Sequence, residues 1–254
     1  MKQTSGNSRR TFIKSLPLGV SLFTGAEQFP DVAAAIKPPK ITLRKYDKVL
    51  FQGDSITYWH RKLDAAGYND SDALGSGYAL LAASELIYTY PAKELKFFNK
   101  GISGNGINDL AARWDTDCLD LKPDVVSILI GVNDYSLKMR ENKAGNAAAF
   151  RKTYQQLLER TVAALPNVKL IIAEPFAIKG LMFVTDAWFP GFDEYRNVSK
   201  ELAEKFDAAF IPLQSIFEKA IELAPAAYWC GDGIHPSLAG ARLMAGAWLE
   251  NIRK

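Results

Sequence analysis

One serine in this chain is placed where it could act as a nucleophile. Ser55 ends the segment 48–55, in which an apolar run stops at a glycine, an acid and a hydroxyl. Such a run indicates a buried strand that carries its last side chains to the carboxyl edge of a sheet, where open α/β proteins bind ligands. Because an unassisted hydroxyl attacks poorly at neutral pH, Ser55 needs a base to take its proton.

The base is expected in the segment 230–236. The chain contains only two histidines, His60 and His235. His235 follows Asp232 by three residues, so one loop could supply an imidazole and the carboxylate that orients it. His60 lies five residues after Ser55 with no acid at a useful spacing on its own loop, so we expect it on the rim or the surface.

Two other loops contain groups that could stabilise an oxyanion. Gly104 lies in a glycine-rich segment, and a glycine amide can approach a ligand closely because it lacks Cβ. Asn133 follows an apolar run and offers a side-chain amide. With the backbone amide of Ser55 these groups would make three donors, each typically worth ~10²–10³ in rate. The residues therefore predict acyl transfer.

Segments with strand and helix patterns alternate along the chain, as an α/β fold requires. Apolar runs predict five strands, at residues 48–53, 95–99, 124–130, 168–173 and 209–213. Helical spacing predicts helices at residues 78–90, 107–121, 147–165, 192–206, 215–223 and, capped by Ser237, 238–252. This alternation implies right-handed crossovers, a parallel sheet with helices on both faces, and convergence of the candidate loops on one side of it.

The four loops resemble a known set of sequence blocks. In their order along the chain they are similar to the blocks of the GDSL, or SGNH, hydrolase family, at residues 53–55, 101–105, 131–134 and 232–236. The resemblance extends from about residue 49 to the C-terminus. It implies a three-layer, flavodoxin-like SGNH hydrolase fold and metal-independent, cofactor-free chemistry. The site residues that it implies are a triad of Ser55, Asp232 and His235, and an oxyanion hole of Ser55, Gly104 and Asn133.

A narrower resemblance concerns the substrate. Residues 74–78, 99–105, 109–114 and 122–124 are similar to segments of bacterial acetylxylan esterases that deacetylate xylo-oligosaccharides. This implies an O-acetyl sugar ester as substrate, and it implies that the chain could form a homo-oligomer. Residues 58–61 depart from the usual pattern just after the nucleophile, so the rim of the substrate site stays open.

Other polar and aromatic residues near these loops invite two interpretations each. We expect Asp54 to order the serine loop and Asp134 to brace the Asn133 loop, as acids in turns commonly do. Aromatic faces suit pyranose rings, although large aromatics more often simply bury area. The candidate substrate contacts are Trp59, Tyr135, Trp188 and Trp229.

Three rival functions remain open at this point. The same triad could hydrolyse lipid or thioester acyl chains. The acids and histidine of these loops could instead hold a metal ion that acts on phosphate esters; the four residues concerned are Asp54, Asp134, Asp232 and His235. A non-catalytic carbohydrate binder is the third, although it would have no use for a nucleophile with its base.

Composition and the N-terminal segment indicate an exported globular protein. Of the 254 residues, 48% are hydrophobic and 23% are charged. The sequence lacks the basic stripe interleaved with aromatics that is expected of a nucleic-acid-binding protein, so no nucleic-acid partner is expected. Residues 1–36 resemble a twin-arginine export signal, because Arg9 and Arg10 precede an apolar segment too short to span a bilayer. We expect a periplasmic or secreted protein with no stable membrane anchor after signal cleavage, and one domain at residues 37–254. Cys118 and Cys230 are expected to be unpaired.

Overall fold

The computed structural model describes residues 41–65, 67–140 and 146–253. The predicted export signal at residues 1–36 lies outside these ranges, so the signal and the domain boundary after it stay predictions. Within the described ranges no helix has both the length and the apolar character needed to cross a membrane. Cys118 and Cys230 are both buried and free, as expected.

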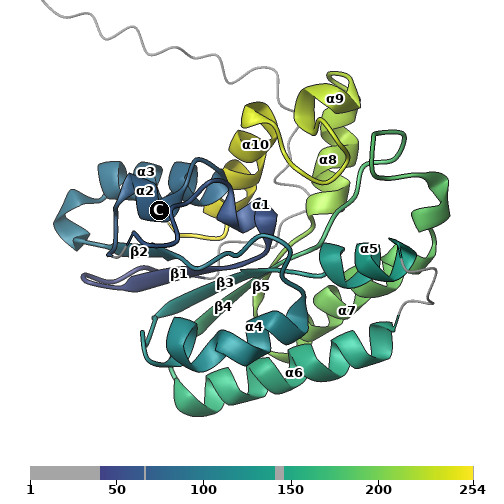
Figure 1. Ribbon diagram of the computed structural model, residues 1–254. Coiled ribbons are helices and arrows are strands. Elements are labelled where there is room, and N and C mark those ends of the chain that lie inside the picture. The colour runs from purple at the N-terminus through teal and green to yellow at the C-terminus, as the bar shows by residue number, and fades with distance from the viewer. Residues whose placement is uncertain (1–40, 66, 141–145, 254) are drawn as a thin grey trace, which may run out of the picture. The chain divides into compact units, whose positions relative to one another are not determined.

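Five parallel strands form one sheet in the order β2-β1-β3-β4-β5 (Figure 1). The strands are β1 (Lys48–Gly53), β2 (Lys96–Asn99), β3 (Val125–Leu129), β4 (Lys169–Ala173) and β5 (Ala209–Ile211). Each lies within two residues of its predicted bounds, because long apolar runs mark strands that are covered on both faces. The α/β fold class is confirmed.

Helices cover both faces of the sheet. The longer ones are α3 (Tyr78–Thr89), α4 (Ile107–Trp114), α5 (Val132–Arg140), α6 (Ala147–Ala164), α7 (Gly191–Lys205), α8 (Leu213–Ile221) and α10 (Leu238–Leu249). One-turn helices are α1 (Ser55–Tyr58), α2 (Ser71–Leu74) and α9 (Ala226–Trp229). Figure 1 shows α3 and α10 on one face and α4, α6 and α7 on the other.

Three helical regions differ from their prediction. The α-helical part of the predicted helix at 107–121 ends at Trp114, and a π-helical turn, η3 (Asp115–Leu119), continues it. Helix α5 begins at Val132, so Asn133 lies in the first turn of a helix instead of in a loop. Helix α8 begins two residues earlier than expected, directly after Pro212, whose fixed φ suits the entry to a helix.

The order of the strands places a topological switch point between β1 and β3. The chain leaves β1 for β2 on one side and reaches β3 on the other, so the connections at the ends of these two neighbours diverge. Their registers align Gly53 with Leu129, and Ser55 and Asn133 follow within a few residues of these ends. Ligands of doubly wound sheets bind at such a switch point.

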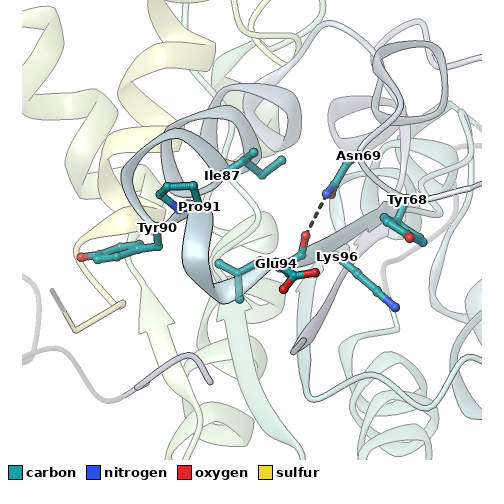
Figure 2. Close-up of a pocket in the computed structure, with 8 residues that line it drawn as sticks. Tyr68, Asn69, Ile87, Tyr90, Pro91, Glu94 and Lys96 are labelled. Atoms are coloured by element: carbon teal, nitrogen blue, oxygen red, sulfur yellow. Dashed lines mark hydrogen bonds between the residues drawn. The ribbon is translucent and has the colours of Figure 1, made fainter. Parts of the chain in front are cut away.

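A pocket of about 250 Å³ lies beside the edge strand β2 (Figure 2). The side-chain amide of Asn69 donates to the Leu95 carbonyl at 2.8 Å, and its oxygen accepts from the Phe97 amide at 2.8 Å. The side chain of Asn69 thereby pairs with backbone groups at the open edge of β2, as a neighbouring strand would. The residues that line this pocket are Tyr68, Asn69, Ile87, Tyr90, Pro91, Glu94, Leu95 and Lys96, and none of them is a predicted site residue.

The sheet and helix α10 share one buried polar contact. Trp248 of α10 packs on Phe51 with ring centroids 5.1 Å apart, and its indole nitrogen donates to the Ser127 hydroxyl at 3.0 Å. We expect Ser127→Ala to reduce the free energy of unfolding by about 1–3 kcal/mol, because it leaves a buried N–H without an acceptor. In the control variant Ser84→Ala, which changes an exposed residue, the free energy of unfolding measured with urea should change by less than about 0.5 kcal/mol. Equal losses in the two variants would contradict this role of the contact.

Candidate active site

The structure brings Ser55, His235 and Asp232 into one hydrogen-bonded chain. The Ser55 hydroxyl lies 2.8 Å from His235 Nε2. The other ring nitrogen, Nδ1, lies 2.7 Å from Asp232 Oδ2. A carboxylate on Nδ1 fixes the imidazole in the tautomer whose Nε2 is free to accept the hydroxyl proton. This is the geometry that a serine nucleophile requires of its base.

The carboxylate of Asp232 is held in its ionised form. Burial favours the neutral form, but hydrogen bonds outweigh it and hold the pKa of Asp232 below its ordinary value. Its Oδ1 accepts from the backbone amides of His235 at 2.7 Å and Ile234 at 2.8 Å, and its Oδ2 faces the imidazole. The group can therefore stabilise an imidazolium opposite it.

The loop that carries the acid and the base is fixed by the connection after β4. The Ile178 amide donates to the Gly233 carbonyl at 2.9 Å, and the Phe183 amide donates to the Asp232 carbonyl at 2.9 Å. Gly233 has φ +98°, and a Cβ on it would lie 2.8 Å from Val184 Cγ2. The approach of the two segments therefore requires glycine at this position.

Ser55 is presented by a turn between β1 and α1. Asp54 precedes it and accepts a hydrogen bond from the Ile56 amide at 3.0 Å, so it caps the one-turn helix in which Ser55 is the first residue. The expectation that Asp54 orders this loop is confirmed. The Ser55 amide has no acceptor among the described residues, which leaves it available to a ligand.

The loop of Gly104 is linked to β1 and to Asn133. The Ile102 amide donates to the Gly53 carbonyl at 3.1 Å, and the Asn133 side-chain amide donates to the Asn105 carbonyl at 3.1 Å. Gly104 has φ +82°, as the third residue of a type II turn requires. Its amide has no acceptor in the part of the chain that the structure describes. The three predicted oxyanion donors thus belong to segments that contact one another.

Two further carboxylates near the serine are buried and lack a partner for one oxygen. Burial raises the pKa of Asp54 to about 7, against the Ile56 hydrogen bond and with the Asp134 charge adding to the rise. Burial likewise raises the pKa of Asp134 to about 6. Oδ1 of Asp134 accepts from the Ile107 amide at 2.9 Å, so this acid braces α5 against α4, close to its expected role. Among the described residues neither Oδ2 has a hydrogen-bond partner.

The predicted aromatic contacts need correction in three of four positions. Tyr135, Trp188 and Trp229 are each only 5% exposed, so their rings are packed in the core and have no free face for a sugar. Tyr135 and Trp188 belong to one aromatic cluster, and the Tyr135 hydroxyl donates to the Trp188 carbonyl at 2.8 Å. Large aromatic side chains gain stability mainly by burying apolar surface, and this burial accounts for the positions of these three rings.

Trp59 is the predicted aromatic that lies at the site. Its half-buried ring stacks on His235 with centroids 5.7 Å apart and an interplanar angle of 30°. Gly75 and Gly77 let the chain pass close to it, because a Cβ on either would lie within 2.8 Å of Trp59 atoms. His60 is exposed beside Trp59, as expected for a rim residue.

The residues proposed for a metal site do not gather into one. Across the described ranges, no group of three or more His, Cys, Asp and Glu side chains is arranged to hold a metal ion. Asp232 and His235 contact each other, whereas Asp54 and Asp134 are each tied to a backbone amide.

Sequence patterns did not reveal two arginines that hold the loop of Gly104. Arg61 donates through Nε to the Gly101 carbonyl at 2.7 Å, and Arg113 donates to the Lys100 carbonyl at 2.8 Å. Arg61 belongs to the segment 58–61 that departs from the usual family pattern. Arg113 looks from its spacing like a polar residue on an amphipathic helix, so only the packing shows its contacts.

This architecture, with a serine, histidine and aspartate in contact at the carboxyl edge of a parallel sheet, defines an α/β hydrolytic enzyme. The chain belongs to the GDSL-like lipase/acylhydrolase family, whose model matches residues 51–243. It is a carboxylic ester hydrolase.

Individual relatives agree with this assignment. An acetylxylan esterase of Geobacillus stearothermophilus is 36% identical over 211 residues, which cover 81% of this chain and 94% of that enzyme. A solved structure from Parabacteroides merdae, described as a GDSL-like lipase, has a TM-score of 0.81 and 42% identity over 84% of this chain and 98% of that one. The structure of the Geobacillus acetylxylan esterase Axe2 has a TM-score of 0.74 and 34% identity over 83% and 96%. Two Axe2 variants, one with a serine and one with a histidine replaced by alanine, are described as catalytic mutants.

The buried Asp54 predicts a pH dependence of stability. The pKa of Asp54 is about 7 in the folded protein and near 3.8 in the unfolded chain. Its contribution to the stability of the folded protein is therefore fully present below about pH 4 and is lost as the pH rises through 7. Asp54→Asn keeps the acceptor for Ile56 but cannot ionise. We expect the variant to gain stability relative to the parent, on the order of a few kcal/mol, between pH 5 and pH 8.

Urea unfolding of both proteins at the two pH values measures this gain. The exposed control Asp64→Asn should show no such change with pH. A difference between Asp54→Asn and the parent that is the same at pH 5 and pH 8 would show that Asp54 is ionised in the folded protein throughout.

Proposed function

We propose that this chain is a serine esterase that hydrolyses O-acetyl esters on xylan or related oligosaccharides. The observation that carries the proposal is the contact of Ser55 with His235 at 2.8 Å, continued to Asp232 at 2.7 Å. Along the Axe2 chain, the serine and the histidine replaced in the catalytic mutants are separated by almost the same number of residues as Ser55 and His235, which are 180 residues apart here. This spacing supports the same roles for Ser55 and His235.

In the first half of the reaction, Ser55 Oγ attacks the acetyl carbonyl carbon while His235 Nε2 takes its proton. The carbonyl oxygen becomes an oxyanion, and the amides of Ser55 and Gly104 with the side-chain amide of Asn133 are its donors. When the tetrahedral intermediate collapses, the bond to the sugar oxygen breaks. His235 returns the proton to that oxygen, and the sugar leaves as an alcohol.

In the second half, water replaces the sugar. His235 takes a proton from the water as its oxygen attacks the acetyl carbon of the Ser55 ester, and the same donors hold the second oxyanion. Collapse breaks the bond to Ser55 Oγ, which regains the proton from His235, and the product leaves as acetic acid, which ionises to acetate in water. Asp232 stays ionised and stabilises the imidazolium in both halves.

A second acyl specificity has a specific observation in its favour. Met182 and Phe183 are 76% and 50% exposed, and the Phe183 amide is bonded to the Asp232 carbonyl, so apolar side chains stand beside the site. An exposed apolar rim could receive a longer acyl chain, as in a lipid or thioester hydrolase. The same triad serves both substrates, so acyl-chain preference decides between them.

Replacement of the nucleophile gives the first test. Ser55→Ala should lower the turnover of 4-nitrophenyl acetate by at least about 10⁴-fold, because no other group can form the acyl ester. An organophosphate should modify the parent at Ser55, as a peptide map would show, and should not modify the variant. Turnover in Ser55→Ala within about tenfold of the parent would refute the mechanism.

Acyl-chain preference gives the second test. We expect kcat/KM for 4-nitrophenyl acetate to exceed that for the octanoate by at least about tenfold, since a pocket shaped for acetyl excludes longer chains. Release of acetate from acetylated xylo-oligosaccharides, measured on the same preparation, tests the sugar assignment. Faster hydrolysis of the octanoate would favour the lipid or thioester alternative.

A further inference from the structure

Arg113 occupies a mostly buried position at the centre of a polar network. It extends from α4, its side chain is only 15% exposed, and no part of the proposed reaction uses it. Its acceptors are Asn105 Oδ1 at 2.9 Å, the Lys100 carbonyl at 2.8 Å, Gln52 Oε1 at 3.0 Å, Asp117 Oδ2 at 2.7 Å and the Gly53 carbonyl at 3.4 Å.

Four of these five acceptors, all except Asp117, belong to the end of β1 or to the loop of Gly104. Gln52 and Gly53 end β1, and only Asp54 separates Gly53 from Ser55. Lys100 and Asn105 flank the turn of Gly104 on either side. The Asn105 carbonyl in turn accepts from the Asn133 amide, so one of the two N–H bonds of that amide is used to orient it and the other is left for a ligand. One guanidinium therefore links all three donors.

The network needs the shape of arginine. A guanidinium presents donors in a rigid planar fork, whereas a lysine ammonium is a single point of charge and could not reach a side chain and two carbonyls in different segments at once. Most of the acceptors are fixed backbone or buried side chains, and Gln52 is wholly buried. The guanidinium is thus held in one orientation.

The π-helical turn after α4 completes this arrangement. It places Asp117 against the guanidinium and lets the Asp117 carbonyl accept from Gln52 Nε2 at 3.2 Å. Single π-helical turns often occur at functional sites. The carboxyl group of Asp117, 2.7 Å from Arg113 Nη1, gives the guanidinium an ion-pair partner in this mostly buried region.

We propose that Arg113 is a positioning residue of the oxyanion hole, which keeps the donors of Gly104 and Asn133 in place opposite Ser55. The inference rests on the proposed serine mechanism and adds to it. Arg113 contacts neither Ser55 nor His235, so it acts through the loop of Gly104 and the end of β1. Donors held within a fraction of an ångström stabilise an oxyanion far better than mobile ones, because no reorganisation is needed during reaction.

This role predicts a particular kinetic effect. An oxyanion exists in the transition state and not in the bound ester, so a disordered hole lowers kcat and leaves KM nearly unchanged. The triad is untouched, so the pH midpoint of kcat/KM stays where it is in the parent. A loss of folded protein would also lower the apparent kcat, because a smaller fraction of the enzyme would be active. Active-site titration with an organophosphate measures this active fraction, so that kcat can be corrected for it.

The experiment measures kcat, KM and the pH profile with 4-nitrophenyl acetate. We expect Arg113→Met to lower kcat about 10²-fold and Arg113→Lys at least about tenfold, with KM within about threefold and an unchanged pH midpoint. Asn105→Ala removes the acceptor of Arg113 Nε and keeps the backbone carbonyl for Asn133. It should lower kcat in the same way, and its effect combined with Arg113→Lys should be less than the product of the two.

The matched control is Arg160→Lys. Arg160 pairs with Asp115 of the same π-helical turn but is exposed and contacts no oxyanion segment, so its kcat should stay within about twofold of the parent. If Arg113→Met does not fold, Asn105→Ala decides. Unchanged kcat in the folded Arg113 and Asn105 variants, or a shifted pH midpoint, overturns the inference. If Ser55→Ala is inactive in that case, only this inference fails; an active Ser55→Ala would overturn the proposed mechanism itself.

Discussion

The site depends on one contact between parts of the chain that are 180 residues apart, the 2.8 Å approach of His235 to Ser55. A parallel sheet makes such a contact achievable, because every strand ends at the same edge and the connections there can meet. Ser55 and Asn133 follow β1 and β3, which are neighbours at the point where the strand connections diverge. His235 reaches them from the loop between α9 and α10, which hydrogen bonds from Ile178 and Phe183 hold in place.

The carboxyl groups around the site have two different roles, which are set by their surroundings. Asp232 accepts from two amides and faces an imidazole, so its pKa lies below the ordinary value although burial opposes this. Asp54 and Asp134 are more deeply buried, and each has one oxygen without a partner in the described structure, so their pKa values rise to about 7 and about 6. The first is suited to face a developing cation, and the other two serve to hold the backbone of the serine turn and of α4.

Sequence patterns predicted the elements whose residues repeat a simple rule. The five strands are continuous apolar runs, and their alternation with helices indicated that the loops of Ser55, Gly104, Asn133 and His235 would converge on one side of the sheet. Patterns could not place side chains whose environment is set by distant segments. From sequence alone, Trp188 and Tyr135 could be either core residues or sugar-binding surfaces until their burial is known. Trp59 is placed at the site by its stacking on His235, and the close approach of Gly75 and Gly77 to it is likewise seen only in the structure. Likewise the partners of Arg113 come from three segments, and no local pattern records them.

In the proposed mechanism, Ser55 carries the acyl group between the two halves of the reaction. Rapid acid quenching during the turnover of 4-nitrophenyl acetate, followed by peptide mass spectrometry, tests it directly. We expect one acetylated peptide, with the acetyl group on Ser55, formed no more slowly than the steady-state turnover and lost when substrate is exhausted. An acetyl group on another residue that forms and decays at the rate of turnover, with Ser55 unmodified, would contradict it.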